Sequence, residues 1–226
     1  MTSPIVFYYM DASAPSRAIW MVLELLGVKY EERYVNLINK DHKTNWYAEI
    51  NPRQKVPAIE DNGLRLAESR AIATYLINQY GSETQKQQLY PPDLRERAVI
   101  DQHLYVGEHV FDEIMGHVNV GGVLLSNELI RPEKTSNAKS ALRIVEKLLE
   151  KHTYTATDHF SLADIFYYVA VHLLSLTDFN EWNEYPNVVS WTKKIQELPY
   201  YEKTCGEPVK NLRVAYKEAL KKNANL

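Results

Sequence analysis

Strand patterns occur only in the first third of this chain, and this contrast constrains the fold more than any other feature. Short β-branched and aromatic runs, helical stripes and turn residues predict the order strand, helix, strand, two-stranded hairpin, helix. We expect strands at residues 4–10, 30–37, 56–60 and 64–66, and helices at residues 14–26 and 67–80. This alternation predicts an α/β domain.

Beyond Pro91 and Pro92 the chain is expected to be entirely helical. Helical periodicity covers residues 94–125, 132–151, 161–176, 186–198 and 208–221. The polar segment before it ends in the two prolines, which interrupt helices and strands alike. We therefore predict a first domain at residues 1–83, a linker at 84–93 and an all-α domain at 94–226.

Three short signals mark the ends of elements. Gly27 follows the apolar stripe of the first predicted helix and should end it. Residues 61–63 read Asp-Asn-Gly, which tolerate the positive φ angles that a tight hairpin turn requires. Ser161 and Asp164 have the spacing of a capping box, a helix-start signal that belongs to folding and not to catalysis.

Charge, cysteine content and hydropathy argue against several classes of protein. The net charge is −3 without a long basic run, so we expect no nucleic-acid partner. The only cysteine is Cys205, which excludes an internal disulfide. The longest apolar stretch has about 12 residues, whereas a membrane span needs about 20. We expect a cytoplasmic protein without a membrane partner, and without a metal because His103, His109 and His117 match no tight zinc motif.

Four motifs, in this order along the whole chain, resemble those of cytosolic glutathione transferases of the serine type. They are YYMDASAPSR at residues 8–17, EINPRQKVPAI at 49–59, AESRAIATYL at 67–76 and SLADI at 161–165. The delta, epsilon and theta classes of that family are the most similar. The resemblance implies an α/β thioredoxin-like N-terminal domain plus an all-α C-terminal domain, a homodimer, and glutathione as co-substrate without a further cofactor.

Ser13 occupies the place where the thioredoxin-like fold carries its attacking cysteine. A hydroxyl cannot exchange disulfides, but it can donate a hydrogen bond to the thiolate of a bound glutathione. We therefore predict Ser13 as the catalytic residue. Ser16 is an alternative, although it is expected inside the first helical turn. Tyr9 and Tyr8 are further alternatives, because other classes of the family use a tyrosine at the end of this strand.

The resemblance also implies where glutathione would bind. Val56, before a cis-proline at Pro57, would pair through its backbone with the cysteinyl unit. At the start of the second helix, Ser69 would hold the γ-glutamyl carboxylate and Glu68 the ammonium group. The complete predicted set is His42, Gln54, Lys55, Val56, Pro57, Glu68, Ser69 and Arg70.

One position departs from the family pattern. Gln54 stands where serine-type members often carry a histidine, so the glycyl carboxylate would meet a neutral amide instead of a potential cation. Lys55 could replace the missing charge. His42 matches another histidine of the pattern.

A second, hydrophobic substrate is expected between the two domains. The predicted residues of the first domain are Met10, Ala14 and Leu37. Those of the second share one helical face: Tyr105, Glu108, His109, Asp112, Met115 and Gly116.

The sequence thus predicts an enzyme that conjugates glutathione to small hydrophobic electrophiles, and a peroxidase activity toward organic hydroperoxides is compatible with the same site. The alternative is a non-catalytic protein on the same fold, either a binder of hydrophobic ligands or a structural protein. Thiol transfer would need a cysteine at position 13. The sequence names neither the electrophile nor the class within the serine-type members.

Overall fold

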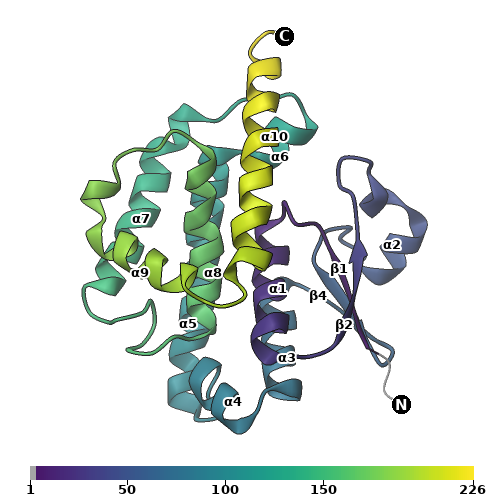
Figure 1. The fold of residues 1–226 in the computed structure, drawn as a ribbon, viewed down its shortest axis with the longest axis vertical. Coiled ribbons are helices and arrows are strands. Elements are labelled where there is room, and N and C mark those ends of the chain that lie inside the picture. Colours follow the sequence, from purple (N-terminus) through teal and green to yellow (C-terminus); the bar gives the residue numbers. More distant parts are fainter. Residues whose placement is uncertain (1–3) are drawn as a thin grey trace. The chain divides into compact units, whose positions relative to one another are not determined.

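The computed structural model describes residues 4–226, which form two compact units that divide between Tyr90 and Pro91 (Figure 1). The first three residues of the predicted domain 1–83 lie outside the described part. The linker expected at residues 84–93 is largely helical, because it contains α4 (Glu83–Leu89). Ser82 and Gln85 form a capping box that starts this helix, a signal that the sequence analysis missed.

A four-stranded sheet organises the first unit. Its strands are β1 (Ile5–Tyr9), β2 (Tyr30–Tyr34), β3 (Ala58–Asp61) and β4 (Leu64–Ala67), in the spatial order β2-β1-β3-β4. β2 is parallel to β1, with Tyr30 opposite Ile5, whereas β3 runs antiparallel to β1 and to β4. The parallel pair requires a crossover, which α1 (Ala14–Leu26) provides. The predicted order of the four strands and of the helices α1 and α3 (Ser69–Tyr80) is therefore confirmed. The first three strands are shorter than predicted, β4 is one residue longer, and the short helix at Asn45–Ile50 was not predicted.

Successive side chains of β1 point to opposite faces of the sheet, as the period of a strand requires. Tyr9 lies on the α1 face, with its ring 5.1 Å from that of Trp20. Tyr8 lies on the other face, where it packs on a buried cluster that includes Tyr47 of α2 (Asn45–Ile50). The helices α1 and α3 (Ser69–Tyr80) pack together on the α1 face (Figure 1).

The predicted turns and helix ends of the first unit are present. Gly27 ends α1 in the left-handed conformation at φ 66°, and its N–H donates to the carbonyl oxygens of Leu23 and Glu24. Asn62 and Gly63 have φ angles of 47° and 87°, which fit the tight hairpin between β3 and β4.

The second unit, as far as it is described, is helical. It contains α5 (Leu94–Val118), α6 (Val120–Leu125), α7 (Thr135–Leu149), α8 (Leu162–Val171), α9 (Pro186–Gln196) and α10 (Glu207–Asn223), with 3-10 turns between several of them. The single helix predicted at 94–125 is broken by Asn119, which adopts φ 53°. Every residue of α8 is buried, so this helix forms the centre of the core. None of the helices in residues 4–226 has the length and apolar character needed to cross a membrane.

A buried carboxylate extends the predicted capping box. The box between Ser161 and Asp164 is present at the start of α8. Asp164 has no exposed surface, and its two oxygens accept five hydrogen bonds. Two come from Ser161, two from Thr155 and one, at 3.0 Å, from the indole N–H of Trp191 on α9. The carboxylate therefore links the start of α8 to a preceding loop and to another helix.

A second buried carboxylate caps a helix from a distance. Glu146 of α7 accepts hydrogen bonds from the backbone N–H groups of Asn187 and Val188 at 3.0 and 2.9 Å. These groups belong to the first turn of α9, whose N–H donors have no partner within the helix. A negative charge is also favourable at this end of the helix dipole.

Candidate functional site

Ser13 lies at the junction of β1 and α1 and caps the helix. Its hydroxyl oxygen accepts the N–H of Ser16 at 3.3 Å, and its own N–H donates to the carbonyl of Met10 at 2.9 Å. The side chain is half-buried, and no residue within 4–226 accepts the hydroxyl proton. Ser13 can therefore donate a hydrogen bond outward from the N-terminus of α1, where the helix dipole favours an anion.

The competing hydroxyls are differently placed. Ser16 is fully buried in the first turn of α1. Tyr9 donates to a carboxylate oxygen of Glu32 at 2.8 Å, and burial followed by this bond raises the pKa of Tyr9. Tyr8 packs on the opposite face of the sheet, where burial raises its pKa. These contacts leave Ser13 as the partly exposed hydroxyl with a proton to donate.

The turn before Ser13 is held by contacts that the sequence analysis missed. The carboxylate of Asp11 accepts the N–H of Ala12 at 2.8 Å and the hydroxyl of Tyr34 at 3.1 Å. Its carbonyl accepts a hydrogen bond at 2.9 Å from the guanidinium of Arg17, which is fully buried. A buried cation one helical turn from Ser13 raises the local positive potential. Arg17, at the end of the SAPSR stretch, was the sequence feature that could have indicated this contact.

The segment before Pro57 is held by hydrogen bonds from α2 and from the residue that follows this helix. The peptide bond between Val56 and Pro57 is cis, as the resemblance implies. The carbonyl of Lys55 accepts hydrogen bonds from Tyr47 and Asn51 at 2.9 and 2.7 Å. The Val56 side chain packs on the buried cluster below the sheet, while its backbone N–H and carbonyl find no partner within residues 4–226. Such a backbone can pair with an added extended peptide.

The cation next to Gln54 comes from an unexpected position. The side-chain oxygen of Gln54 lies 3.5 Å from the ammonium of Lys43, which follows His42 in a 3-10 turn. Lys55, the predicted source of charge, has an exposed side chain and contributes its carbonyl to the segment described above. His42 is half-buried, and desolvation, followed by the charge of Lys43, lowers its pKa. The imidazole is therefore neutral at neutral pH.

Glu68 stands at the start of α3 in a strained conformation. Its φ angle is 66°, which costs a non-glycine residue about 1–3 kcal/mol and is found most often at functional sites. Its carboxylate pairs with Arg53 at 2.5 Å, and both side chains are more than half exposed. Ser69 and Arg70 are the first residues of α3, so their N–H groups belong to the helix start, which suits a carboxylate ligand.

The residues predicted for a hydrophobic substrate lie in both units. In the first unit Met10 and Ala14 are buried and Leu37 is half-buried. In the second unit the others lie on α5, away from the side that packs in the core; they are Tyr105, Glu108, His109, Asp112, Met115 and Gly116. Tyr105 is 74% exposed, which is unusual for a large aromatic side chain.

Two family models match the chain, one within each of its two units. Residues 7–84 match the family model of the glutathione S-transferase N-terminal domain, and residues 130–199 match that of the C-terminal domain. The chain is 31% identical to glutathione S-transferase D7 of Anopheles gambiae, over 85% of this chain and 86% of the relative.

Solved structures agree with the whole fold. An epsilon-class glutathione S-transferase from the housefly, Musca domestica, is 29% identical, with a TM-score of 0.87 over 95% of this chain and 98% of that one. A glutathione transferase homologue from Drosophila mojavensis, solved with bound glutathione, is 28% identical, with a TM-score of 0.87 over 97% and 98%. A thioredoxin-like unit followed by a helical unit is thus the glutathione transferase fold.

The chain belongs to the glutathione S-transferase family and is of the delta/epsilon type. It is an enzyme, and its reaction is the conjugation of glutathione.

Proposed function

We propose that Ser13 stabilises the thiolate of bound glutathione, which then attacks a small hydrophobic electrophile. The position of Ser13 carries this proposal, since its hydroxyl proton has no acceptor within the described chain and its oxygen is held by α1. A free thiol has a pKa of about 8.5, and lowering it by about two units requires about 2.7 kcal/mol. A hydrogen bond to a charged group supplies about 1.5–3 kcal/mol, and the helix dipole adds to it.

The remaining parts of glutathione have matching partners in the first unit. The unpaired backbone of Val56 would bind the cysteinyl unit as an added strand. The start of α3 at Ser69 would hold the γ-glutamyl carboxylate, and Glu68 would hold the ammonium group. Arg70 would add positive charge near that carboxylate. The strained backbone of Glu68 supports a functional role for this turn.

At the glycyl end, Lys43 and Gln54 would together bind the carboxylate, Lys43 with its charge and Gln54 with its amide. His42 would contribute a neutral donor beside them. This arrangement replaces the histidine that is missing at position 54.

Lys43→Met is expected to raise the KM for glutathione about 3- to 10-fold with little change in kcat, because one partly exposed ion pair contributes about 1 kcal/mol. Steady-state kinetics with glutathione as the varied substrate checks this. Lys55→Met is the matched control, since it removes the same charge from a neighbouring exposed lysine, and its effect on KM should stay below about twofold. The reverse pattern would return the role to Lys55.

The proposal extends to the second substrate, the assembly and the cofactor requirement. The hydrophobic substrate would contact Met10, Ala14 and Leu37 together with the exposed face of α5. The enzyme would act as a homodimer in the cytoplasm and need no cofactor besides glutathione as co-substrate. The reduction of organic hydroperoxides is compatible with the same thiolate. The competing function, the binding of hydrophobic ligands without turnover, predicts no conjugation with any electrophile.

Initial rates of conjugation between glutathione and 1-chloro-2,4-dinitrobenzene test the proposed reaction. We expect saturable turnover in both substrates at neutral pH. A panel of electrophiles and an organic hydroperoxide should follow, because the sequence does not name the electrophile. Glutathione binding by calorimetry, without turnover in the whole panel, would overturn the proposed reaction and support the ligand-binding alternative.

A further inference from the structure

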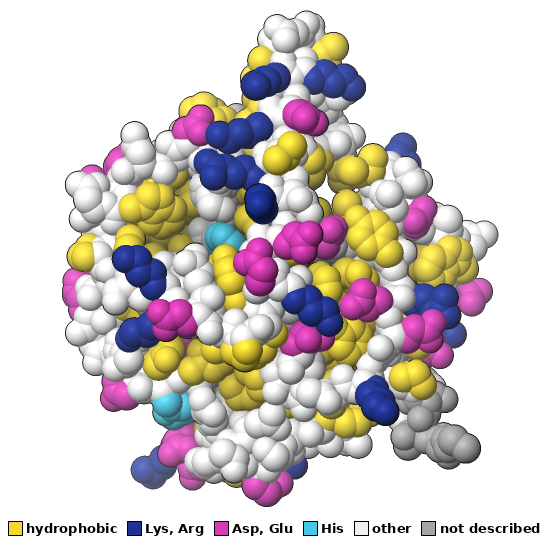
Figure 2. Space-filling view, in the orientation of Figure 1, with side chains coloured by type: hydrophobic (Ala, Val, Ile, Leu, Met, Phe, Trp, Pro, Cys, Tyr) yellow, Lys and Arg dark blue, Asp and Glu magenta, His cyan; other side chains and the backbone are white. Residues whose placement is uncertain are grey.

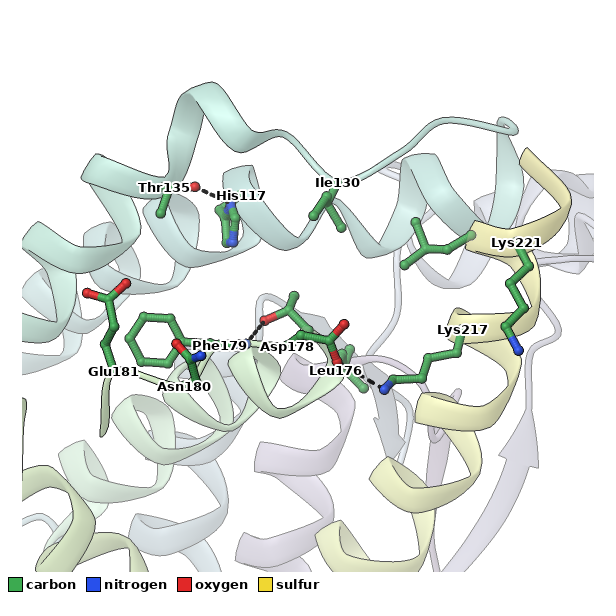
Figure 3. A pocket seen from close by; sticks show the side chains of 12 residues that line it. His117, Ile130, Thr135, Leu176, Asp178, Phe179, Asn180, Glu181, Lys217 and Lys221 are labelled. Atoms are coloured by element: carbon green, nitrogen blue, oxygen red, sulfur yellow. Dashed lines mark hydrogen bonds and ion pairs between the residues drawn. The ribbon is translucent and has the colours of Figure 1, made fainter. Parts of the chain in front are cut away.

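A cavity of about 500 Å³ in the helical unit holds charged and polar groups that already pair within the chain (Figure 3). Asp178 pairs with Lys217 at 3.1 Å, and the Nδ1 of His117 lies 3.1 Å from the carbonyl oxygen of Arg131. Figure 3 shows the side chain of Lys221 turned away from this space. A charged ligand would have to displace these contacts. The ion pair that bears on ligand choice lies instead in the first unit, within the proposed glutathione site.

Arg53 and Glu68 form this ion pair, which joins two segments of the site. The distance between Nη1 of Arg53 and Oε1 of Glu68 is 2.5 Å, although the residues are 15 positions apart. Arg53 belongs to the turn before the cis-proline, and Glu68 immediately precedes α3. Glu68 is the residue proposed to hold the ammonium group of the γ-glutamyl unit. One of its two carboxylate oxygens is thus already bonded to a cation of the chain itself.

We infer that Arg53 is a specificity-determining residue, which lowers the selectivity of the site for the ammonium group of glutathione. This inference rests on the proposed binding of the γ-glutamyl unit at the start of α3. Because the guanidinium is bonded to Glu68, an ammonium group has to share the carboxylate with a second cation or displace it. Either arrangement reduces the free energy that the ammonium group gains. The site should therefore accept peptides of the same shape that lack this amino group.

The backbone holds Arg53 in reach of Glu68. The N–H of Arg53 donates to the side-chain oxygen of Asn51 at 3.0 Å, and the N–H of Gln54 donates to the carbonyl of Asn51 at 2.8 Å. Asn51 is 3% exposed, and its side-chain amide donates to the carbonyl of Lys55 at 2.7 Å. The turn at residues 51–55 is thus tied to a buried side chain, so the guanidinium extends from an anchored backbone.

The carboxylate of Glu68 is directed to Arg53 and not to the helix that it precedes. The carbonyl of Glu68 accepts the N–H of Ile72 at 2.9 Å, whereas its side chain caps no N–H group of α3 in the described chain. A carboxylate has about four lone-pair sites on its two oxygens, so Oε2 can still accept a hydrogen bond from a ligand. Arg53 therefore weakens the ammonium site without closing it.

Arg53 acts with opposite signs on the two charges of the γ-glutamyl end. The guanidinium repels the ammonium group and attracts the carboxylate, which the start of α3 would hold at Ser69. A ligand that lacks only the amino group separates these effects, because the carboxylate is present in both compounds. The side chains of Arg53 and Glu68 are each more than half exposed, so the effect of each charge is moderate.

Calorimetric titration with S-hexylglutathione, and with the same compound without its amino group, tests the inference. The alkylated sulfur makes the readout independent of Ser13 chemistry. For the native chain we expect the two dissociation constants to differ by less than about threefold. In Arg53→Met their ratio should rise by about three- to fivefold, the factor that corresponds to one partly exposed ion pair. Arg53→Lys keeps a cation and should keep most of the native ratio.

The matched control is Arg33→Met, because Arg33 is also an exposed arginine, paired with Glu31 at 2.6 Å. It lies on β2, at the opposite edge of the sheet from β4, the strand that leads to Glu68. Figure 2 shows cationic and anionic side chains interspersed over one face of the molecule, so a charge at that distance is largely screened at Glu68. This variant should change the ratio by less than about 1.5-fold.

Glu68→Gln distinguishes this inference from the proposed site itself. It should weaken the binding of S-hexylglutathione and remove the effect of Arg53→Met on the ratio. Unchanged affinity in Glu68→Gln would mean that the γ-glutamyl unit binds elsewhere, which would overturn the proposed site and this inference with it. A clear loss in Glu68→Gln, together with an unchanged or smaller ratio in Arg53→Met, would overturn the inference alone. Thermal melting should be unchanged in each variant, since both side chains are exposed.

Discussion

Ser13→Ala is expected to lower kcat/KM for conjugation at neutral pH by about 10- to 100-fold, the loss that corresponds to one charge-assisted hydrogen bond. The native enzyme would hold the thiol largely ionised at neutral pH. In the variant the pKa of the bound thiol should return toward about 8.5, so that the deficit shrinks between about pH 7 and 9. Initial rates across this range, with the ultraviolet absorbance of bound thiolate as a direct readout, check both points.

The controls separate catalysis from helix capping. Ser13 also accepts the N–H of Ser16, so its removal by alanine is expected to destabilise α1 by about 0.5–2 kcal/mol. Ser13→Gly costs the cap only a few tenths of a kcal/mol. It should lose as much activity as Ser13→Ala while remaining more stable. Tyr9→Phe should retain most activity, because the hydroxyl of Tyr9 is bound to Glu32. Loss of activity in Tyr9→Phe with a fully active Ser13→Gly would reverse the assignment.

Asp164→Asn is expected to lower the free energy of unfolding by about 3–5 kcal/mol, since it leaves buried donors facing an amide N–H₂ group. The substitution keeps the shape of the side chain, so the loss reports on the five hydrogen bonds and not on a cavity. Urea unfolding followed by circular dichroism and tryptophan fluorescence measures it.

Two further variants each remove a single hydrogen-bond donor to Asp164, and each should lose less stability than Asp164→Asn. Trp191→Phe and Thr155→Val each delete one side-chain donor to Asp164 and should lose about 1–2 kcal/mol. If Asp164→Asn fails to fold, the two single-donor variants still decide the outcome. A loss below about 1 kcal/mol in Asp164→Asn would mean that the carboxylate is not the centre of this network.

The sequence predicted correctly several elements that depend only on residues close together along the chain. The stripe of α1, its end at Gly27 and the turn at Asn62-Gly63 depend on the residues within each element, and they were predicted correctly. Ser161 and Asp164 are three positions apart, so their capping box was also visible. The break at Asn119 and the helix at Glu83–Leu89 were not predicted. Both have a local cause, because Asn119 adopts the left-handed conformation and Ser82 forms a capping box with Gln85.

The groups that contact the predicted site residues lie far from them in the sequence. Lys43 reaches Gln54 across 11 positions, so the adjacent Lys55 looked like the natural source of charge. Tyr9 was an open alternative to Ser13 until its contact with Glu32, 23 positions away, accounted for its hydroxyl. A glutathione-binding role for Glu68 was predicted from a motif, whereas its positive φ angle was not predictable from the sequence.

The sequence by itself determined the two kinds of domain, the family, and the hydroxyl at position 13, because these depend on periodicity and short motifs. Only the tertiary structure decided which groups surround them. It brought Arg17 to the carbonyl of Asp11 before Ser13, Lys43 to Gln54 and Trp191 to Asp164. The physical reason is that a hydrogen bond or ion pair requires partners within about 3–4 Å, and the folded chain sets that distance independently of their separation in sequence.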